Sequence, residues 1–530
     1  MVQEKMREES PLWKATILLG LATLLTRATN FLTQMVIAHH FGANLDADAY
    51  FLVENGMLIA GSFLITSFSV AFIPIWTNYR FHEGPHAANR FHYGFIVFAT
   101  AASLGLSLGM GLVGFAFSSR FLQMGVDPLL QATGRLMLVA SPAVALMGIT
   151  AGCTSILQAN RHFLVPELGN TFYNLVLLGA ALFFAARLGV ISLAWATVFA
   201  AEVRLLVQVP ISRKISSFKA GGGDQSTGLG LVQKRVLPIF AAYAGTQVTL
   251  LLGNLMASNL PAGSVSALVY ASRVMLLPVG ILVLPLQTTI LPTLSQQVAQ
   301  KDFRQLGKTM LDTFRMLALA GIPISIGIVF LRLPLVQLLY QRGAFDAAAA
   351  ALTADLLAWF ALGLPAVAVL MLINSVYCAM GDTLALVCVN GFHWAATALL
   401  GAVLVRVAGA SGAAMGISIS TTLACVLGLA RLKKSIPTFK WKGLVEVAVK
   451  AAFASGVMFS LLTGVNFLIT QGLKLQLTWH WTGAVLQIVL AFLLGSSSFT
   501  MAAWILKIDE LQVWREKMNF SKLSLRIRAR

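Results

Sequence analysis

Long apolar runs recur from one end of this chain to the other, and short polar or basic segments separate them. A helix of about 20 apolar residues is long enough to cross roughly 30 Å of hydrocarbon. Each run therefore predicts a membrane-spanning α-helix. We expect about 14 of them, over residues 12–40, 48–77, 91–117, 128–158, 164–186, 189–211, 231–258, 264–297, 308–333, 350–378, 383–405, 411–432, 443–470 and 479–506.

Composition agrees with this pattern. The chain has 530 residues, of which 58% are hydrophobic and 11% charged, and its mean hydropathy is +0.80. The short alternating segments of a membrane β-barrel are missing. The predicted fold class is therefore an all-α polytopic membrane protein. The four cysteines lie in apolar runs without paired or metal-binding spacing, so we expect neither a disulfide framework nor a metal site.

The net charge of +18 reflects topology rather than nucleic-acid binding. In the 14-helix arrangement, one side of the membrane carries 26 Lys and Arg residues and the other side carries 6. Positive charge favours the cytoplasmic side, so both termini should be cytoplasmic. We expect a multi-pass protein of the bacterial cytoplasmic (inner) membrane, in contact with membrane lipids and with no nucleic-acid partner.

The segment SSFKAGGGDQSTGLG, residues 216–230, is a flexible hydrophilic linker between two similar halves. SPAVALMGIT in the first half parallels LPAVAVLMLI in the second, at an offset near 220 residues. Six helices per half is an even number, so the halves should have the same orientation. The predicted parts are two pseudo-symmetric six-helix lobes, two further helices and a basic cytoplasmic tail, at residues 1–215, 231–434, 435–506 and 507–530.

An arginine, Arg27, lies within the first apolar run. A charge near the bilayer centre costs at least about 2.5–3.5 kcal/mol on insertion scales. Helical spacing places the polar residues of this run on one face. That face favours a water-filled cavity, whereas an interface of interhelical hydrogen bonds is the alternative. Its members are Thr16, Gly20, Thr23, Arg27, Asn30 and Gln34.

A second arginine, Arg273, lies early in the eighth run, and three prolines follow it at intervals of seven residues. Each proline removes a backbone donor and favours a kink. Glu54 is the acid best placed to pair with a cavity arginine, so we expect it near Arg27 or Arg273. A protonated Glu54 bonded within its own bundle is the alternative.

Motifs for enzymatic chemistry are missing from the sequence. GGGDQSTG lacks the lysine of a P-loop, and no metalloprotease or nucleophile-elbow motif occurs. We expect a transporter that is not an enzyme, holds no cofactor and uses no ATP. A coupling ion or the membrane potential would supply the energy. Because arginine suits phosphate, two cavity arginines favour an anionic, phosphate-bearing substrate.

Four stretches carry a family resemblance: RATNFLTQMVIAHHFGANLDADAYF, SFSVAFIPIWTNY, SVSALVYASRVMLLPVGIL and LLYQRGAFDAAAA. They resemble the MurJ/MviN lipid II flippases of the MOP exporter superfamily over most of the chain. The resemblance implies alternating access between two lobes and an arginine-rich cavity for the lipid II pyrophosphate. It also implies a groove for the polyprenyl tail in the last two helices.

The resemblance assigns roles to particular residues. Arg27 matches a cavity arginine, and other functional positions fall on Ala38, Asp48, Ser266 and Arg273. We expect Asn30, Gln34 and Glu54 to line the substrate path. The family's remaining cavity charges are absent here, at Thr33, Gly61, Ser62, Ser272 and Leu276.

The expected function is flipping of a polyprenyl-pyrophosphate-linked saccharide across the cytoplasmic membrane, with the peptidoglycan precursor lipid II as the first choice. The cavity changes leave open a flippase for another undecaprenyl-linked glycan, such as an exopolysaccharide precursor. A multidrug or ion antiporter of the MATE type and a membrane scaffold that does not transport are further alternatives. Function of the antiporter would depend on a carboxylate such as Glu54.

Overall fold

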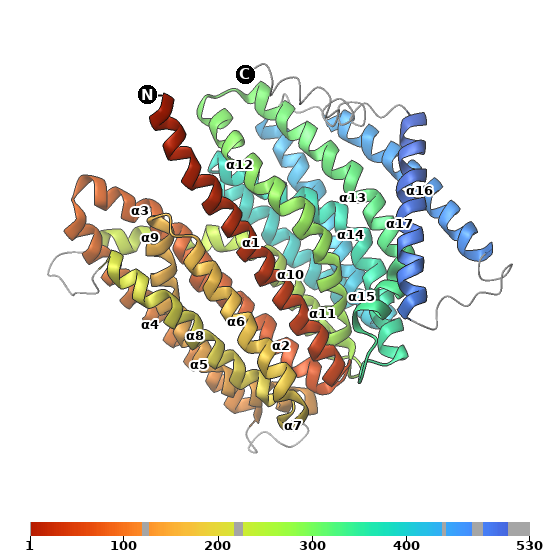
Figure 1. The fold of residues 1–530 in the computed structure, drawn as a ribbon, viewed down its shortest axis with the longest axis horizontal. Coiled ribbons are helices and arrows are strands. Elements are labelled where there is room, and N and C mark those ends of the chain that lie inside the picture. Colours follow the sequence, from red (N-terminus) through yellow and green to blue (C-terminus); the bar gives the residue numbers. More distant parts are fainter. Residues whose placement is uncertain (1, 119–126, 217–225, 437–440, 469–480, 507–530) are drawn as a thin grey trace. The chain divides into compact units, whose positions relative to one another are not determined.

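The computed structural model (Figure 1) describes residues 2–118, 127–216, 226–436, 441–468 and 481–506. Each regular element in these ranges is a helix. The elements are α1 (Val2–Phe41), α2 (Leu45–Gly61), η1 (Ser62–Ser67), α3 (Phe68–His82), α4 (Pro85–Ser118), α5 (Pro128–Ala159), α6 (Leu164–Phe183), α7 (Ala185–Leu188), α8 (Ile191–Ile215), α9 (Ser226–Tyr243), α10 (Gly245–Ala257), α11 (Ser264–Pro278), η3 (Val279–Val283), α12 (Leu284–Ala299), α13 (Phe303–Tyr340), α14 (Ala347–Met380), α15 (Thr383–Ser435), α16 (Trp441–Phe467) and α17 (Trp481–Ile505).

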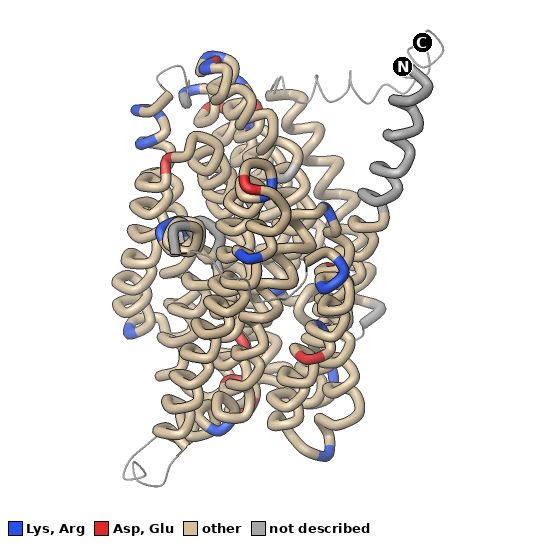
Figure 2. The backbone as a smooth tube through the Cα atoms, turned by 90° about the vertical axis from the view of Figure 1, so that its left-hand side faces the viewer, with Lys and Arg blue, Asp and Glu red and all other residues tan. Residues whose placement is uncertain are grey.

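The all-helical membrane fold predicted from the sequence is confirmed. Within the described residues, ten helical runs are long and apolar enough to cross a membrane. Charged residues are sparse along the helices (Figure 2). A long apolar helix satisfies its backbone hydrogen bonds internally, which is what hydrocarbon requires. The count of 14 spans stays a prediction.

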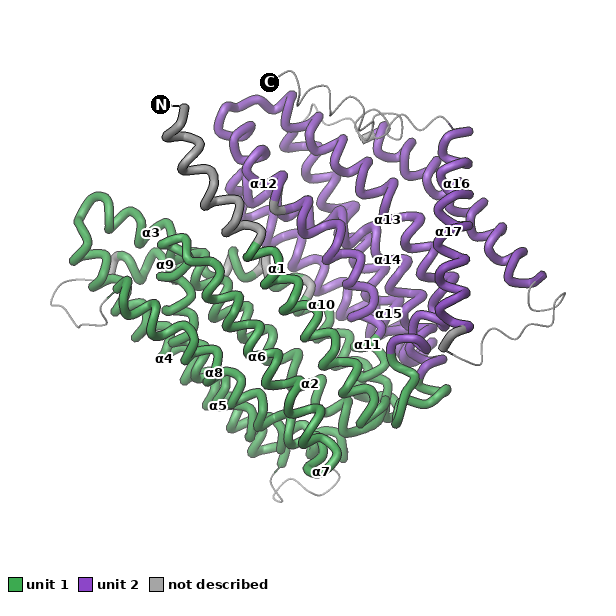
Figure 3. The backbone as a smooth tube through the Cα atoms, in the orientation of Figure 1, with its two compact units in different colours: residues 1–270, 340–349 green, residues 271–339, 350–530 purple. Residues whose placement is uncertain are grey.

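The chain forms two compact units (Figure 3). Unit 1 comprises residues 1–270 and 340–349, and unit 2 comprises residues 271–339 and 350–530. Unit 1 thus includes α9, α10 and the segment between α13 and α14. The lobe boundaries predicted at residues 215 and 231 stay a prediction, and most of the predicted linker lies outside the described residues, as does the basic tail.

The π-helical segments η1 and η3 support the internal repeat. The run from Leu45 to His82 in unit 1 contains η1, and the run from Ser264 to Ala299 contains η3 in its unit 2 portion. Ser62 and Val279 start the two segments, 217 residues apart, close to the offset of the sequence repeat. In η1 the hydroxyl of Ser67 donates to the Ser62 carbonyl at 3.0 Å. Single π turns often occur at functional sites.

Prolines and glycines mark the irregular points of the helices. Segment η3 begins directly after Pro278, whose ring removes a backbone donor. In α15, Gly409 has φ +57° and ψ −135°, which divides the long helix into two. The sequence predicts two helices there, over 383–405 and 411–432. Glycine tolerates this backbone conformation because it has no Cβ atom.

Close packing of α4 on α5 depends on glycine. A Cβ atom at Gly148 of α5 would overlap Ser103 Oγ and the Ala99 carbonyl oxygen of α4. Ser103 also donates to the Ala145 carbonyl at 2.9 Å, which joins the two helices. The small side chain therefore sets the distance between the helices.

Gly148→Ala should destabilise unit 1. Overpacking of a close contact typically costs about 1–3 kcal/mol, so we expect a lower melting temperature of the purified protein. Gly109→Ala is the matched control, because nothing lies within 4 Å of a Cβ atom at Gly109 of the neighbouring α4. Equal melting temperatures of the two variants would contradict this account of the packing.

Candidate functional site

The polar face of α1 makes hydrogen bonds to neighbouring helices in unit 1. Asn30 Nδ2 donates to Asn174 Oδ1 of α6 at 3.3 Å. Gln34, which is 2% exposed, donates from Nε2 to Glu54 Oε1 of α2 at 3.3 Å. Asn30 and Gln34 thus take part in the interhelical contacts that the sequence left as an alternative. Their role in lining a substrate path stays a prediction.

The two arginines predicted to bind substrate have different surroundings. Arg27 is exposed on the surface of unit 1, among the exposed leucines of α1. Arg273 is partly buried in the portion of α11 that belongs to unit 2. Arg27 thus belongs to unit 1 and Arg273 to unit 2. The pairing of Glu54 with either of them stays a prediction.

Asp48 lies at the centre of a buried polar contact between α2 and α11, and it is 1% exposed. Its Oδ2 accepts from the Gly263 backbone N–H at 2.7 Å. Its Oδ1 accepts from the backbone N–H and from the hydroxyl of Ser266, each at 2.6 Å. The first N–H groups of a helix carry partial positive charge, so the carboxylate caps α11.

Local sequence explains how Asp48 reaches this position. Asn44 caps α2, because its Oδ1 accepts from the Ala47 backbone N–H at 2.9 Å. Asp48 follows in the first turn of α2. The turn before α11 holds Gly263 at φ +93°, which directs its N–H toward the carboxylate. A Cβ atom at Gly263 would lie 2.5 Å from the Ala43 carbonyl oxygen, so no larger residue fits.

A segment far along the chain completes the same region of unit 1. The Ala344 backbone N–H donates to the His39 carbonyl at 2.8 Å. Gly343 has φ +60°, and a Cβ atom there would overlap that same carbonyl oxygen. We call this region the junction: the end of α1, the start of α2, the start of α11 and residues 340–349.

Aromatic rings fill the interior of the junction. Tyr270, fully buried, donates from its hydroxyl to the Gly42 carbonyl at 3.1 Å. The centroid of its ring lies 5.0 Å from that of Tyr340, 5.4 Å from that of Phe345 and 5.2 Å from that of Phe51. Such pairs add to burial through their quadrupoles. The junction is therefore a tightly packed contact.

Three of the predicted site residues belong to the junction. Ala38 is fully buried near the end of α1, where its carbonyl accepts from the Gly42 N–H at 2.8 Å. Asp48 and Ser266 are bonded to each other as described. Sequence reasoning missed Gly42, Gly343 and Tyr270. The two glycines occur in the sequences FGAN and RGAF, each between two long apolar runs. A glycine at such a place indicates a tight turn, and that was the signal that could have identified them.

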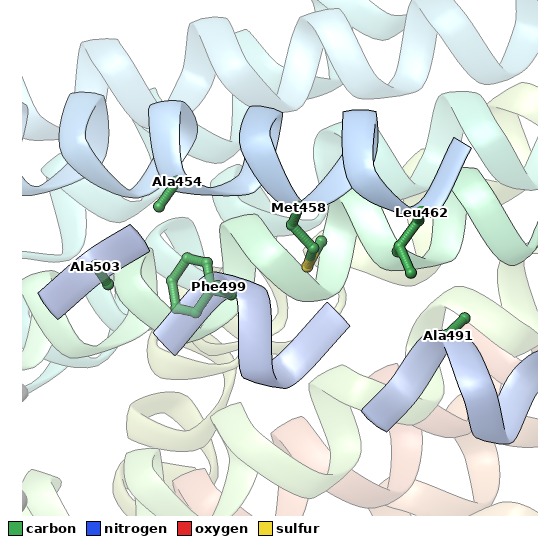
Figure 4. Close-up of a cluster of buried hydrophobic side chains, with 6 residues drawn as sticks. All are labelled: Ala454, Met458, Leu462, Ala491, Phe499 and Ala503. Atoms are coloured by element: carbon green, nitrogen blue, oxygen red, sulfur yellow. The ribbon is translucent and has the colours of Figure 1, made fainter. Parts of the chain in front are cut away.

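In unit 2, α16 and α17 form an antiparallel pair that packs on α13. Ala454, Met458 and Leu462 of α16 face Ala491, Phe499 and Ala503 of α17 (Figure 4). One end of this pair borders a groove with about 310 Å³ of open space. Apolar side chains line most of it, with Asn466 and Gln487 as the polar members.

The fold and the two repeated halves define the class of protein. It is a multi-pass helical membrane protein. The model of the lipid II flippase MurJ family matches residues 37–501, and this chain belongs to that family. Because a flippase is a transporter, the family agrees with the transporter function predicted from the sequence.

Relatives of this chain span most of its length. The lipid II flippase MurJ of Burkholderia cenocepacia is 26% identical over 439 residues, which cover 80% of this chain and 84% of the relative. The probable lipid II flippase MurJ of Thermotoga maritima is 26% identical over 516 residues, 94% of this chain and 98% of the relative.

Solved structures share the fold. A lipid II flippase MurJ in an inward closed conformation matches with a TM-score of 0.76 at 22% identity, over 93% of this chain and 100% of that one. An inward-facing multidrug resistance transporter of the MATE family, from the MOP superfamily, matches with a TM-score of 0.66 at 13% identity. This match covers 80% of this chain and 98% of the MATE transporter.

Proposed function

We propose that this protein moves lipid II from the cytoplasmic to the outer leaflet of the bacterial cytoplasmic membrane by alternating access, without enzymatic chemistry. The family match over residues 37–501 is the observation that carries the proposal. The names of the relatives from Burkholderia and Thermotoga support lipid II as the substrate.

The junction is the gate toward the outside in this proposal. The excess of Lys and Arg supports cytoplasmic termini, and with that orientation α1 ends and α11 begins at the outer surface. The hydrogen bonds of Asp48 and the packing around Tyr270 hold that end closed. For export, this contact separates and the cytoplasmic side closes.

The substrate's pyrophosphate binds at Arg27 and Arg273 in this proposal. A guanidinium offers several donors in a fixed geometry that matches phosphate oxygens. The hydrogen bonds of Asn30 and Gln34 keep α1 in register with α6 and α2, so that Arg27 is presented in a constant place. The groove beside α16 and α17 accepts the polyprenyl tail, because its lining is mostly apolar.

Transport of a charged headgroup needs an energy source. The sequence lacks a nucleotide-binding motif, so we assign this role to an ion gradient or to the membrane potential. Moving one elementary charge through 100 mV is worth about 2.3 kcal/mol. No cofactor is required in this scheme.

Another undecaprenyl-linked glycan is the second candidate substrate. Thr33, Gly61, Ser62, Ser272 and Leu276 stand where the resemblance implies charged residues. Fewer charges suit a saccharide with other polar groups, such as an exopolysaccharide precursor. The pyrophosphate carrier and the route across the membrane would be the same.

Complementation tests the proposal. A strain depleted of its essential lipid II flippase should grow when it expresses this protein. Arg27→Ala and Arg273→Ala should each lower transport about tenfold or more, as the loss of one charge-assisted contact to phosphate predicts. Plating efficiency and lipid II exposed on the outer leaflet are the measurements.

The controls separate the alternatives. Arg90→Ala removes a partly buried arginine of α4 outside the proposed site and should leave rescue unchanged. Failure of a well-expressed wild type to rescue would contradict lipid II as the substrate and favour the other glycan. If both arginine variants rescue growth as well as the wild type does, the proposed site is contradicted. Loss of function in Glu54→Gln alone would favour an antiporter.

A further inference from the structure

Basic side chains gather at one end of unit 1, where helices α3 and α5 end. Arg80 is in the last turn of α3, and its guanidinium carbon lies 5.0 Å from the centroid of the Trp76 ring. Its Nη1 donates to Asn160 Oδ1, directly after α5, at 2.8 Å. Asn160 Nδ2 in turn donates to the Ile156 carbonyl at 2.9 Å. The exposed guanidinium is therefore held from two sides, by an aromatic ring and by an amide.

These side chains offer donors and positive charge to a ligand. A guanidinium has several N–H groups in a fixed fork, and Asn160 accepts from one of them. Among the described residues, Arg80 and Arg161 form no ion pair, and the acid that follows α3, Glu83, is exposed. The indole N–H of Trp76, which is 4% exposed, has no acceptor in the same part of the chain. A buried donor of this kind indicates that an acceptor is missing.

Arg161 brings a second positive charge to the same turn at a conformational cost. It directly follows Asn160 and has φ +63°. Its backbone N–H donates to the Gln158 carbonyl at 3.0 Å, and the N–H of His162 donates to the Leu157 carbonyl at 2.8 Å. Glycine is the usual residue in this conformation at the end of a helix. A cation that is kept there despite the strain indicates a use for its charge.

The second half of the chain shows that the fold does not need these two arginines. The turn after α14 corresponds to the turn after α5 and has the same pair of backbone hydrogen bonds, but Gly381 takes the left-handed position with φ +68°. At the repeat offset, Val298 of α12 stands in the place of Arg80. Both helix ends are therefore formed without arginine in unit 2, so Arg80 and Arg161 serve a purpose other than ending the helices.

The level of these arginines in the membrane suits a lipid phosphate. The apolar runs predicted from the sequence end at residues 77 and 158, three residues before Arg80 and Arg161. At about 1.5 Å of rise per residue, Arg80 lies about 4.5 Å beyond the hydrocarbon, within a headgroup layer that is roughly 5–7 Å deep. Phe81 is next in the chain and 81% exposed. A lipid covers this apolar surface better than water does.

We propose that Arg80 and Arg161 bind the phosphate of an anionic phospholipid, such as phosphatidylglycerol, in the cytoplasmic leaflet. A guanidinium that is already oriented loses little freedom when it binds phosphate oxygens. Arg161 adds attraction for a headgroup with net negative charge. A zwitterionic headgroup carries its own cation and gains less from the two arginines. The bound lipid joins the ends of α3 and α5, whichever lipid the protein transports.

Native mass spectrometry of the protein released from nanodiscs tests the site. The wild type should retain phosphatidylglycerol, and Arg80→Gln should bind it about tenfold more weakly, because a charge-assisted contact is lost. In phosphatidylcholine nanodiscs, added phosphatidylglycerol should raise the melting temperature of the wild type by about 2–5 °C and that of Arg80→Gln by less. Equal retention by the two proteins would overturn the proposal. So would an equal rise with inorganic phosphate alone, which would assign the site to a soluble anion.

Two substitutions by glycine keep the test independent of folding. Arg161→Gly removes one charge and relieves the backbone, as Gly381 does in the second half, so this variant should fold and bind phosphatidylglycerol more weakly. Lys301→Gly is the matched control, because Lys301 has φ +56° in the turn after α12 but is followed by an acid, Asp302. This control should bind as the wild type does. If Lys301→Gly weakens binding as much as Arg161→Gly, general surface charge explains the effect and the proposal fails.

Discussion

Asp48→Ala should abolish rescue of a flippase-depleted strain, although the protein still inserts in the membrane. The change leaves the buried backbone N–H groups of Gly263 and Ser266 without an acceptor, and the Ser266 hydroxyl keeps only the Gly263 carbonyl at 3.2 Å. Hydrogen bonds to a charged group contribute about 1.5–3 kcal/mol each, so the closed junction loses several kcal/mol. A shift of about 5.5 kcal/mol is enough to invert a 99:1 population. The junction should therefore stay open, and lipid II exposure on the outer leaflet should fall to background.

The measurement combines rescue with access to the junction. A cysteine introduced at Ala43 should react faster with an external thiol reagent in the Asp48→Ala background. Asp46→Ala is the matched control, because Asp46 lies in the same helical turn but is exposed. Wild-type growth and unchanged labelling in Asp48→Ala would rule out the junction as a gate.

Gly343→Ala should have the second-largest effect. The backbone of Gly343 has φ +60°, and the new methyl group would overlap the His39 carbonyl oxygen. The hydrogen bond from Ala344 to that carbonyl would be displaced, so residues 340–349 would separate from the end of α1. We expect a loss of rescue of about tenfold or more, together with a lower melting temperature.

Gly189→Ala provides the control for backbone strain. Gly189 has φ +67°, and nothing lies within 4 Å of a Cβ atom there. Both variants bear the cost of an alanine at positive φ, about 1–3 kcal/mol. Only Gly343→Ala adds the overlap with α1. If the two variants behave alike, strain rather than the contact explains the phenotype.

The fold could be predicted from the sequence because hydrocarbon leaves the chain few choices. Backbone groups in lipid must be satisfied within a helix, so apolar length alone identifies the elements. The repeat was visible as well, and η1 and η3 occur at its offset. The membership of residues 340–349 in unit 1 was not visible, because periodicity describes single helices and carries no information on which segments meet.

The candidate site could be predicted only in part. The resemblance identified Asp48 and Ser266, but their bond joins residues 218 positions apart. No spacing rule reaches that far. The polar face of α1 follows from helical spacing, but its neighbours do not, so the bond from Gln34 to Glu54 is a finding of the structure and the cavity-lining role stays a prediction.

The composition of unit 1 has a consequence for biosynthesis. Residues 340–349 supply the Ala344 and Tyr340 contacts of the junction, but they are synthesised after α11, α12 and α13. The first compact unit therefore cannot be completed while its own helices leave the ribosome. It must wait, partly assembled in the bilayer, until about two-thirds of the chain has been translated. Insertion of α13 is thus a step in the folding of a unit to which that helix does not belong, and the order of translation becomes part of how the protein reaches its closed state.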